Sequence, residues 1–344
     1  MRVGIIGYGI AGRIFHGRLL RDTPGAQVAA VVTTNPERRA EVAADFPDAV
    51  CRDDVAGMLA ADRLDLVVVA SPTEHHLDAA QQCAALGVPM VVDKPFATTA
   101  AQAERIVTTA AAAGVGLTVF QNRRWDSDFL TLRRLVGAGE LGRVLRFESR
   151  FERWRPAPAP GKWREDLPPE RGGGTLLDLG SHLVDQAVQL LGPVRAVYAE
   201  VAARRGTAAD DDVFLSLTHD GSPSGGTVHS HLSCGNLAGA PGPRMRVLGT
   251  GGAFVVDDLD GQEDALRAGL PPTTAATPVG RLCRGEEVAA VIPTPGDWAS
   301  FYPAVFAALR GAGAMPVDPA DAVRTMEILD AARESAATGT VVPL

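Results

Sequence analysis

The sequence is short of cysteine, of aromatic residues and of positive charge. Its 344 residues include only 4 cysteines, none of them in a CxxC pair, which argues against a disulfide framework or a metal site and favours a reducing cytoplasm. The net charge is -8, so nucleic acid and anionic membranes are not expected partners. No apolar run approaches the ~20 residues of a membrane span, and we expect no signal peptide before the first apolar run.

Residues 1–121 alternate short apolar runs with helical patterns. The chain is longer than a single hydrophobic core usually supports, so two domains are expected. We predict the first over residues 1–121. Continuous apolar strands separated by helices indicate a parallel sheet covered on both faces, which predicts a Rossmann-type dinucleotide-binding domain in an α/β fold. The expected strands are 3–6, 28–32, 66–70, 90–92 and 117–120. One expected helix ends at residue 20, and the others are 38–45, 77–86 and 100–113.

Residues 122–344 are rich in strands separated by turn residues. This pattern predicts a second, α+β domain with an open, mostly antiparallel sheet, which would bind the substrate and form the oligomer. Residues 268–284 are rich in Pro, Thr and Gly and are interpreted as a loop. The expected strands are 144–153, 194–201, 213–218, 226–233, 244–248 and 253–256, and the expected helices are 126–136, 298–309, 319–336 and one around 178.

The motif GYGIAG follows the first predicted strand and precedes a helix. In a dinucleotide site Gly7 permits the tight turn, Gly9 lets the backbone approach the pyrophosphate, and Gly12 allows close packing of helix on sheet. The helix that follows offers free N–H groups to phosphate, so Ile10 and Ala11 are also predicted to contact the cofactor. The alternative is a glycine-rich turn without a ligand.

The end of the second strand carries hydroxyl groups instead of an acidic residue. An Asp or Glu there would bind the ribose 2′-hydroxyl of NAD, but this strand ends at Thr33 and Thr34, and Arg38 follows. Hydroxyl groups and an arginine suit the 2′-phosphate of NADP, so NADP is predicted in preference to NAD. The alternative is that these are solvated residues at the start of a helix.

Two further strand ends carry candidate side chains. Ser71 and Pro72 end the third apolar strand and His76 follows, a position suited to the far half of the cofactor; the alternative for His76 is a local hydrogen bond. Lys94 ends the fourth strand, and Pro95 restricts it to an extended backbone. From there its amine can bind both a ribose hydroxyl and a substrate oxygen, whereas alone it would be interpreted as an exposed lysine.

The segment GGGTLLDLGSHLVD places Asp178 and His182 four residues apart. On a helix this spacing brings both side chains to one face. Imidazole, with a pKa of ~6.5, suits a base that removes a hydroxyl proton, and Asp178 would orient the ring or bind a neighbouring hydroxyl. Arg123 and the pair Trp163–Arg164 are predicted to line the substrate pocket. The alternative for Asp178 and His182 is a capped helix with a core histidine. The alternative for Arg123 is a salt bridge, and that for Trp163–Arg164 is a packing anchor.

Three other histidines are given structural interpretations. His16, in the first helix, is interpreted as a packing residue. His229 and His231 share one face of a strand, but no further ligand lies near them in the sequence, so no metal site is predicted.

Together these motifs resemble the glucose–fructose oxidoreductase, inositol dehydrogenase and rhizopine-catabolism (Gfo/Idh/MocA) family, over essentially the whole chain. Its Glu-Lys-Pro signature appears as Asp93-Lys94-Pro95 and its Asp-x-x-x-His pair as Asp178 and His182. Longer strings, including GYGIAGRIFHGRLL and NRRWDSDFLTL, resemble the branch of NADP-dependent scyllo-inositol dehydrogenases. The resemblance implies that Lys94, Asp178 and His182 are catalytic and that the open sheet makes dimer or tetramer contacts. The loop around 271–284 departs from the family pattern, which leaves the substrate open.

The expected function is hydride transfer between NADP(H) and a CH–OH group of a cyclic polyol, sugar or related secondary alcohol. We expect a cytoplasmic homodimer or homotetramer. The alternatives are a reductase of dihydrodiols or other carbonyl compounds, a catalytically silent NADP-binding regulator, and a glycoside-cleaving enzyme that oxidises its substrate transiently.

Overall fold

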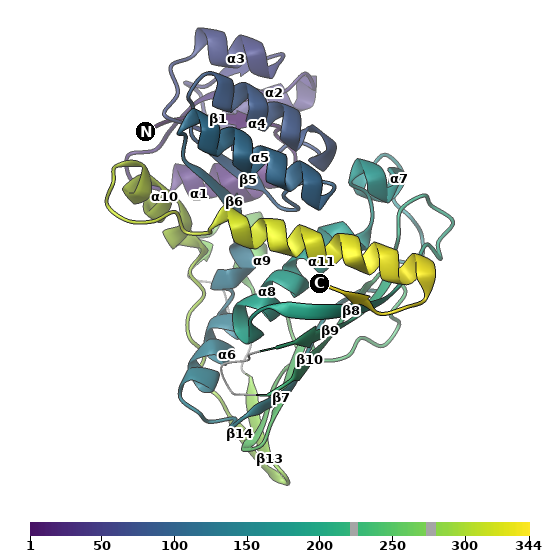
Figure 1. Cartoon of the computed structure of the whole chain (residues 1–344). Coiled ribbons are helices and arrows are strands. Elements are labelled where there is room, and N and C mark those ends of the chain that lie inside the picture. Colours follow the sequence, from purple (N-terminus) through teal and green to yellow (C-terminus); the bar gives the residue numbers. More distant parts are fainter. Residues whose placement is uncertain (221–225, 273–279) are drawn as a thin grey trace. The chain divides into compact units, whose positions relative to one another are not determined.

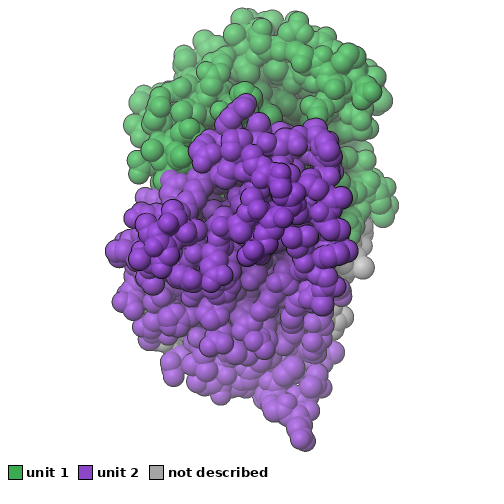
Figure 2. Space-filling model, turned by 90° about the vertical axis from the view of Figure 1, so that its right-hand side faces the viewer, with its two compact units in different colours: residues 1–122, 262–274, 297–323 green, residues 123–261, 275–296, 324–344 purple. Residues whose placement is uncertain are grey.

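A computed structural model describes residues 1–220, 226–272 and 280–344, and the chain forms two compact units (Figure 2). The first unit contains Met1–Asn122, the described residues of Gln262–Thr274, and Asp297–Val323. The second contains the rest. Residues 262–272 and 297–323, which sequence analysis assigns to the second domain, thus belong to the first unit. The division at residue 121 stays a prediction.

The first unit is built on a six-stranded sheet with the order β3-β2-β1-β4-β5-β6, and every neighbouring pair is parallel. This confirms the predicted Rossmann-type parallel sheet. Sequence analysis missed β3, because its three residues are only partly buried and form no apolar run. The strands are β1 (Arg2–Ile6), β2 (Gln27–Val32), β3 (Val50–Arg52), β4 (Leu66–Val69), β5 (Met90–Asp93) and β6 (Leu117–Phe120).

Three helices of the first unit start at capping side chains. Asn35, Asp54 and Thr99 each accept a hydrogen bond from a backbone N–H three residues on, which satisfies a donor that the first helical turn leaves unpaired. Figure 1 shows α4 and α5 side by side. The helices are η1 (Ala11–Gly17), α1 (Arg18–Arg21), α2 (Pro36–Asp45), α3 (Val55–Ala61), η2 (Thr73–His75), α4 (His76–Ala85), α5 (Ala100–Ala113), α9 (Gln262–Arg267), η7 (Trp298–Ser300) and α10 (Phe301–Leu309).

The second unit is built on a nine-stranded sheet with the order β14-β13-β12-β11-β7-β10-β9-β8-β15. Only β10 and β7 pair in parallel; the other seven pairs are antiparallel, which confirms the prediction of a mostly antiparallel sheet. The strands are β7 (Val144–Glu152), β8 (Val194–Ala202), β9 (Asp212–His219), β10 (Val228–Gly235), β11 (Met245–Gly249), β12 (Gly252–Val256), β13 (Arg281–Arg284), β14 (Glu287–Ala290) and β15 (Val342–Pro343).

Strand β13 corrects the interpretation of residues 268–284 as a loop. It pairs with β12 on one side and β14 on the other, and Leu282 is buried. Strand β14 follows after two residues, so β13 and β14 form a hairpin that the sequence-based interpretation missed. The part of the predicted loop between 273 and 279 lies outside the described residues.

Helices α6 and α8 lie against one face of this sheet (Figure 1). The remaining helices of the unit are short, apart from α11, which belongs to the second unit from Arg324 onward. No helix in the described part of the chain is long and apolar enough to cross a membrane. The helices are α6 (Ser127–Gly137), α7 (Trp163–Asp166), η4 (Pro169–Arg171), η5 (Leu176–Gly180), α8 (Ser181–Leu191) and α11 (Pro319–Thr338).

Candidate active site

The glycine loop between β1 and η1 has the geometry of a phosphate cradle. Gly7 has a φ of +89°, and a Cβ atom there would lie 2.8 Å from the Ala70 carbonyl oxygen. At Gly12 a Cβ atom would lie 2.0 Å from the Gly7 carbonyl oxygen, so no side chain fits. A Cβ atom on Gly9, in contrast, would meet nothing closer than 4.0 Å. The loop is therefore tightly packed behind Gly7 and Gly12 and open at Gly9, as a bound pyrophosphate requires.

Arg38 lies beside this loop. The atom nearest to a Cβ on Gly9 is Nη2 of Arg38, and both Arg38 and Thr34 are exposed. Thr33 is buried and its carbonyl oxygen accepts a hydrogen bond from Nε of Arg39. Of the residues predicted to bind the 2′-phosphate, Thr34 and Arg38 are thus accessible to a ligand, whereas Thr33 is held inside the fold.

His76 connects the ends of two parallel strands. It is 1% exposed, and its ring nitrogens lie 3.0 Å from the Ser71 carbonyl oxygen and 3.2 Å from that of Phe96. Pro72, between them in the sequence, is half-buried. These contacts fit a residue that positions the strand ends. That Ser71, Pro72 and His76 contact the cofactor stays a prediction.

Lys94 directly follows β5 at the carboxyl end of the parallel sheet, where ligands bind in such folds. Its backbone N–H donates a hydrogen bond to Oδ1 of Asp93 at 2.8 Å. Asp93 is buried and Lys94 is half-buried, and a cis peptide bond joins Lys94 to Pro95. The structure therefore anchors the backbone of Lys94 through a buried carboxylate.

The glycines before Asp178 leave no room for any side chain. A Cβ atom on Gly173 would lie 1.7 Å from the Leu167 carbonyl oxygen, and one on Gly174 would lie 1.9 Å from Oδ2 of Asp210. Gly174 also has a φ of +98°, which favours glycine. This packing places the start of η5, a π-helical turn that carries Asp178 and continues into α8. The predicted helix is confirmed, but Asp178 lies in a π turn.

Arg164 connects two predicted site residues. Its Nε donates a hydrogen bond to Oδ1 of Asp178 at 3.1 Å, and its guanidinium group lies 4.2 Å from the ring centroid of Trp163. Asp178, Trp163 and Arg164 are all half-buried, so each retains surface for a ligand. The sequence placed Trp163 and Arg164 together, but nothing in it indicated the pairing of Arg164 with Asp178.

His182 lies in the first turn of α8, next to Phe151 of β7. The side chain is 4% exposed, and the two ring centroids are 6.1 Å apart. The guanidinium groups of Arg123 and Arg244 lie 4.9 Å and 4.2 Å from the Phe151 centroid. Arg123 and His182, both predicted to bind substrate, therefore contact the same aromatic ring. Sequence analysis missed Phe151 and Arg244, which carry no local motif.

A buried group of charges lies at the start of α6. Nη1 of Arg123 lies 3.1 Å from Oδ2 of Asp126, Nε of Arg244 lies 3.6 Å from Oδ2 of Asp128, and Asp260 accepts a hydrogen bond from the backbone of α6. Burial, together with the charges of Asp128 and Asp260, raises the pKa of Asp126 to about 8, although Arg123 opposes the shift. Three carboxylates share two guanidinium groups, so this cluster retains a proton at neutral pH.

The proton on this cluster predicts a pH-dependent stability. The pKa of the Asp126 carboxyl group is higher in the folded than in the unfolded protein. Its contribution to the free energy of unfolding is therefore complete below the unfolded pKa and is lost as the pH rises through the folded pKa. One pKa unit corresponds to about 1.4 kcal/mol, so we expect the free energy of unfolding to fall by more than about 1.4 kcal/mol between roughly pH 5 and pH 8. Urea unfolding measures this. Asp126→Asn should flatten the dependence and be the more stable protein at the higher pH; parallel curves would contradict the assignment.

A second ion pair holds the helix that carries His182. Nε and Nη2 of Arg124 bond both carboxylate oxygens of Asp185, at 2.9 Å and 2.5 Å. Asp185 lies one turn beyond His182 on α8, and both partners are buried. This two-point contact fixes the rotation of α8 and hence the direction in which His182 points.

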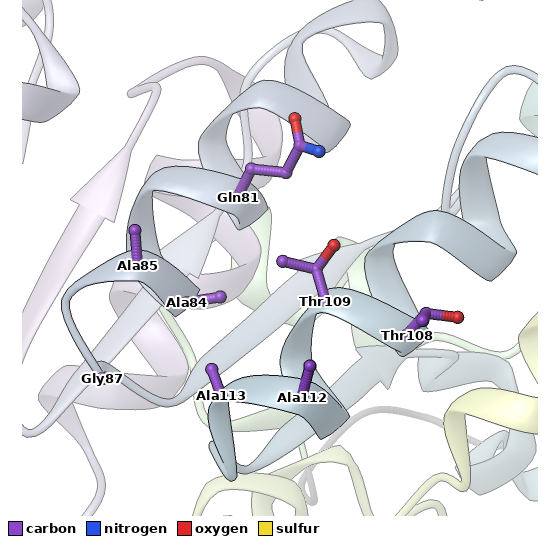
Figure 3. Close-up of a pocket in the computed structure, with 8 residues that line it drawn as sticks. All are labelled: Gln81, Ala84, Ala85, Gly87, Thr108, Thr109, Ala112 and Ala113. Carbon is purple, nitrogen blue, oxygen red and sulfur yellow. The ribbon is translucent and has the colours of Figure 1, made fainter.

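A groove on the surface of the first unit is separate from these residues. It lies between α4 and α5 (Figure 3) and contains no ionisable side chain and no predicted site residue. Small side chains let the two helices pack closely and leave this shallow space, so we assign it no chemistry. Its lining is Gln81, Ala84, Ala85, Gly87, Thr108, Thr109, Ala112 and Ala113.

Comparison with known proteins identifies relatives over the whole chain. Residues 1–121 match the model of the oxidoreductase family with an NAD-binding Rossmann fold, and residues 129–255 match the GFO/IDH/MocA C-terminal domain. The chain is 35% identical to scyllo-inositol 2-dehydrogenase (NADP(+)) IolW of Bacillus subtilis, covering 97% of this chain and 93% of the relative. It is 26% identical to D-apiose dehydrogenase of Paraburkholderia graminis, covering 99% and 88%. The solved structure of yvaA from Bacillus subtilis superposes with a TM-score of 0.90 at 32% identity, covering 100% and 98%.

Proposed function

We propose that this chain, which belongs to the Gfo/Idh/MocA family of oxidoreductases, is an NADP-dependent dehydrogenase or reductase of a cyclic polyol, sugar or related secondary alcohol. The observation that carries the proposal is that Lys94, Asp178 and His182 are all present in a chain 35% identical to a scyllo-inositol dehydrogenase that uses NADP. A catalytically silent regulator would not need all three.

The first unit would hold the cofactor. The open backbone at Gly9 would contact the pyrophosphate, with Ile10 and Ala11 offering the N–H groups of the following turn. Arg38, whose guanidinium group is the nearest neighbour of Gly9, would pair with the 2′-phosphate, with Thr34 beside it. The bound nicotinamide supplies the hydride acceptor or donor.

Three residues would carry out the reaction on the substrate. The ammonium group of Lys94 would polarise the reacting oxygen, and a ring nitrogen of His182 would accept the hydroxyl proton during oxidation. The carboxylate of Asp178 would accept a hydrogen bond from a neighbouring substrate hydroxyl, while the hydrogen bond from Arg164 orients it. In the reductive direction His182 returns the proton to the oxygen that Lys94 polarises.

The test is a panel of polyols, sugars and their ketones with NADP(H) and NAD(H), followed at the nicotinamide absorbance. We expect turnover of at least one cyclic polyol or sugar, faster with the phosphorylated cofactor. Turnover of dihydrodiols alone would favour the carbonyl-reductase alternative. Tight cofactor binding without any turnover would favour the silent regulator.

The proposal extends to the assembly of the protein. Along β9 buried residues alternate with half-buried ones, among them Phe214 and Ser216, so one face of the sheet is partly exposed. We predict a homodimer or homotetramer that covers this face. Light scattering at micromolar concentration should give two or four times the 35.9 kDa of the chain. Phe214→Glu should lower that mass, whereas Leu86→Glu, on an exposed residue of the first unit, should not; a monomeric native protein would contradict the prediction.

All four cysteines are free. We therefore propose a reducing compartment, the cytoplasm, as the site of action.

A further inference from the structure

A chain of buried polar groups lies behind Lys94 in the first unit. Its centre is His16 of η1, which is fully buried. Nδ1 of His16 lies 2.6 Å from the hydroxyl oxygen of Tyr302 on α10, and Nε2 lies 3.7 Å from Oδ1 of Asp93 at the end of β5. The same Oδ1 atom accepts the hydrogen bond from the backbone N–H of Lys94. Two hydrogen bonds and one longer polar contact thus link four residues from three separate segments in a series that ends at Lys94.

The charges of this series are set by burial and by its members. Burial alone would raise the pKa of Asp93, but His16, Lys94 and His76 together hold it below its ordinary value, so the carboxylate is ionised. Burial and the Asp93 charge raise the pKa of Tyr302 well above its ordinary value, so the phenol keeps its proton. The contact with Tyr302 occupies Nδ1 and leaves Nε2, the nitrogen that faces Asp93, to carry a ring proton.

His16 can act through packing of its ring or through its polar nitrogens, and its contacts distinguish the two roles. If the ring only fills space, its main contact is Phe120, whose ring centroid lies 4.4 Å away. If its polarity matters, its role is to stabilise a buried carboxylate that would otherwise be costly to ionise. Tyr302, which contacts His16 through an oxygen, and the ionised state of Asp93 both favour the second role.

We propose that His16 is a positioning residue: by holding the Asp93 carboxylate it fixes the backbone from which Lys94 reaches the reacting oxygen, and Tyr302 holds His16 in the required tautomer. The role in turnover rests on the proposed function of Lys94. The structural link from His16 to the Lys94 backbone does not, so the two can be tested apart.

The principal variant is His16→Phe, which keeps an aromatic ring beside Phe120 and removes both ring nitrogens. Misplacement of a reacting group by about 1 Å can lower a rate ~100-fold, so we expect kcat to fall roughly 10- to 100-fold, with the KM for NADP changing less than about twofold. Without His16, burial of Asp93 is less opposed, so the acid limb of the pH–rate profile should move to higher pH.

Two further variants make the test independent of the folding of His16→Phe. Tyr302→Phe removes a single oxygen and should lower kcat by roughly 2- to 10-fold, the effect of one neutral hydrogen bond. His16→Gln keeps an N–H donor and should recover part of the activity and of the pH profile. The control is Thr118→Val on β6 of the same unit, which removes a buried hydrogen bond to the Val317 carbonyl oxygen. It should lower stability and leave kcat and the pH profile unchanged.

A measurement without substrate tests the link itself. The amide of Lys94 should exchange with solvent about tenfold faster in His16→Phe than in the native protein, because its acceptor is then no longer held in place. If the native enzyme turns over nothing but this exchange still accelerates, the proposed function fails and the positioning inference stands. The inference is overturned if exchange at Lys94 is unchanged, or if His16→Phe and Tyr302→Phe match Thr118→Val in kcat and pH profile.

Discussion

His182→Ala is expected to lower kcat and kcat/KM together by about 10²–10⁴-fold, the usual contribution of a positioned general base. The two constants should fall in parallel because proton removal occurs in the transition state and not in substrate binding. Steady-state kinetics on the best substrate of the panel measures this. NADP affinity, followed by fluorescence, should be unchanged, because the predicted cofactor residues all belong to the first unit.

Lys94→Ala should lose a similar factor, since polarisation of the oxygen and removal of its proton belong to one step. The double variant should lose much less than the product of the two factors, because the groups act as a unit. Lys94→Ala should also weaken NADP modestly, through the predicted contact with the nicotinamide ribose.

The matched control for His182 is His219. It is another buried histidine of the second unit, bonded to the Gly192 carbonyl oxygen at 2.9 Å and to Oγ of Ser230 at 2.8 Å. His219→Gln should therefore change stability and not kcat. A folded His182→Ala protein that kept more than about half of its activity would remove His182 from the mechanism, and Asp178 would become the candidate base.

Arg38→Ala is expected to weaken NADP by roughly 10- to 150-fold, because a charge-assisted hydrogen bond contributes about 1.5–3 kcal/mol. NAD affinity should barely change, since NAD has no 2′-phosphate. The structure supports this expectation by placing the Arg38 guanidinium group next to Gly9 on the open side of the loop. Fluorescence titration with each cofactor measures the two affinities.

Arg39 is the control for this experiment. It is adjacent in sequence, but its Nε donates to the Thr33 carbonyl oxygen and its guanidinium group pairs with Asp53, so it supports the strand end. Arg39→Ala should weaken both cofactors to a similar extent. An equal loss of NADP and NAD affinity in Arg38→Ala would show that Arg38, like Arg39, supports the fold and does not bind the 2′-phosphate.

The parallel sheet and the helix of the Asp178 segment could be predicted because their signals are local. Runs such as Leu66–Val69 are apolar throughout and are buried at every position in the structure, as a strand covered on both faces must be. The glycines of GYGIAG were recognisable for the same reason, because Gly7 and Gly12 occupy a conformation or a close contact that only glycine fits.

What local patterns could not indicate depends on partners distant in the sequence. Arg164 and Asp178 are 14 residues apart, and His16 and Tyr302 are 286 apart. In the unfolded chain water forms hydrogen bonds with all of these polar groups, so the residue types alone do not select partners. The segments that the fold brings together decide the hydrogen-bond partners and the charge of a buried group. The sequence alone therefore determined the fold class and the residue types of the chemistry, and the tertiary structure decided which groups hold Lys94 and Asp178 in place.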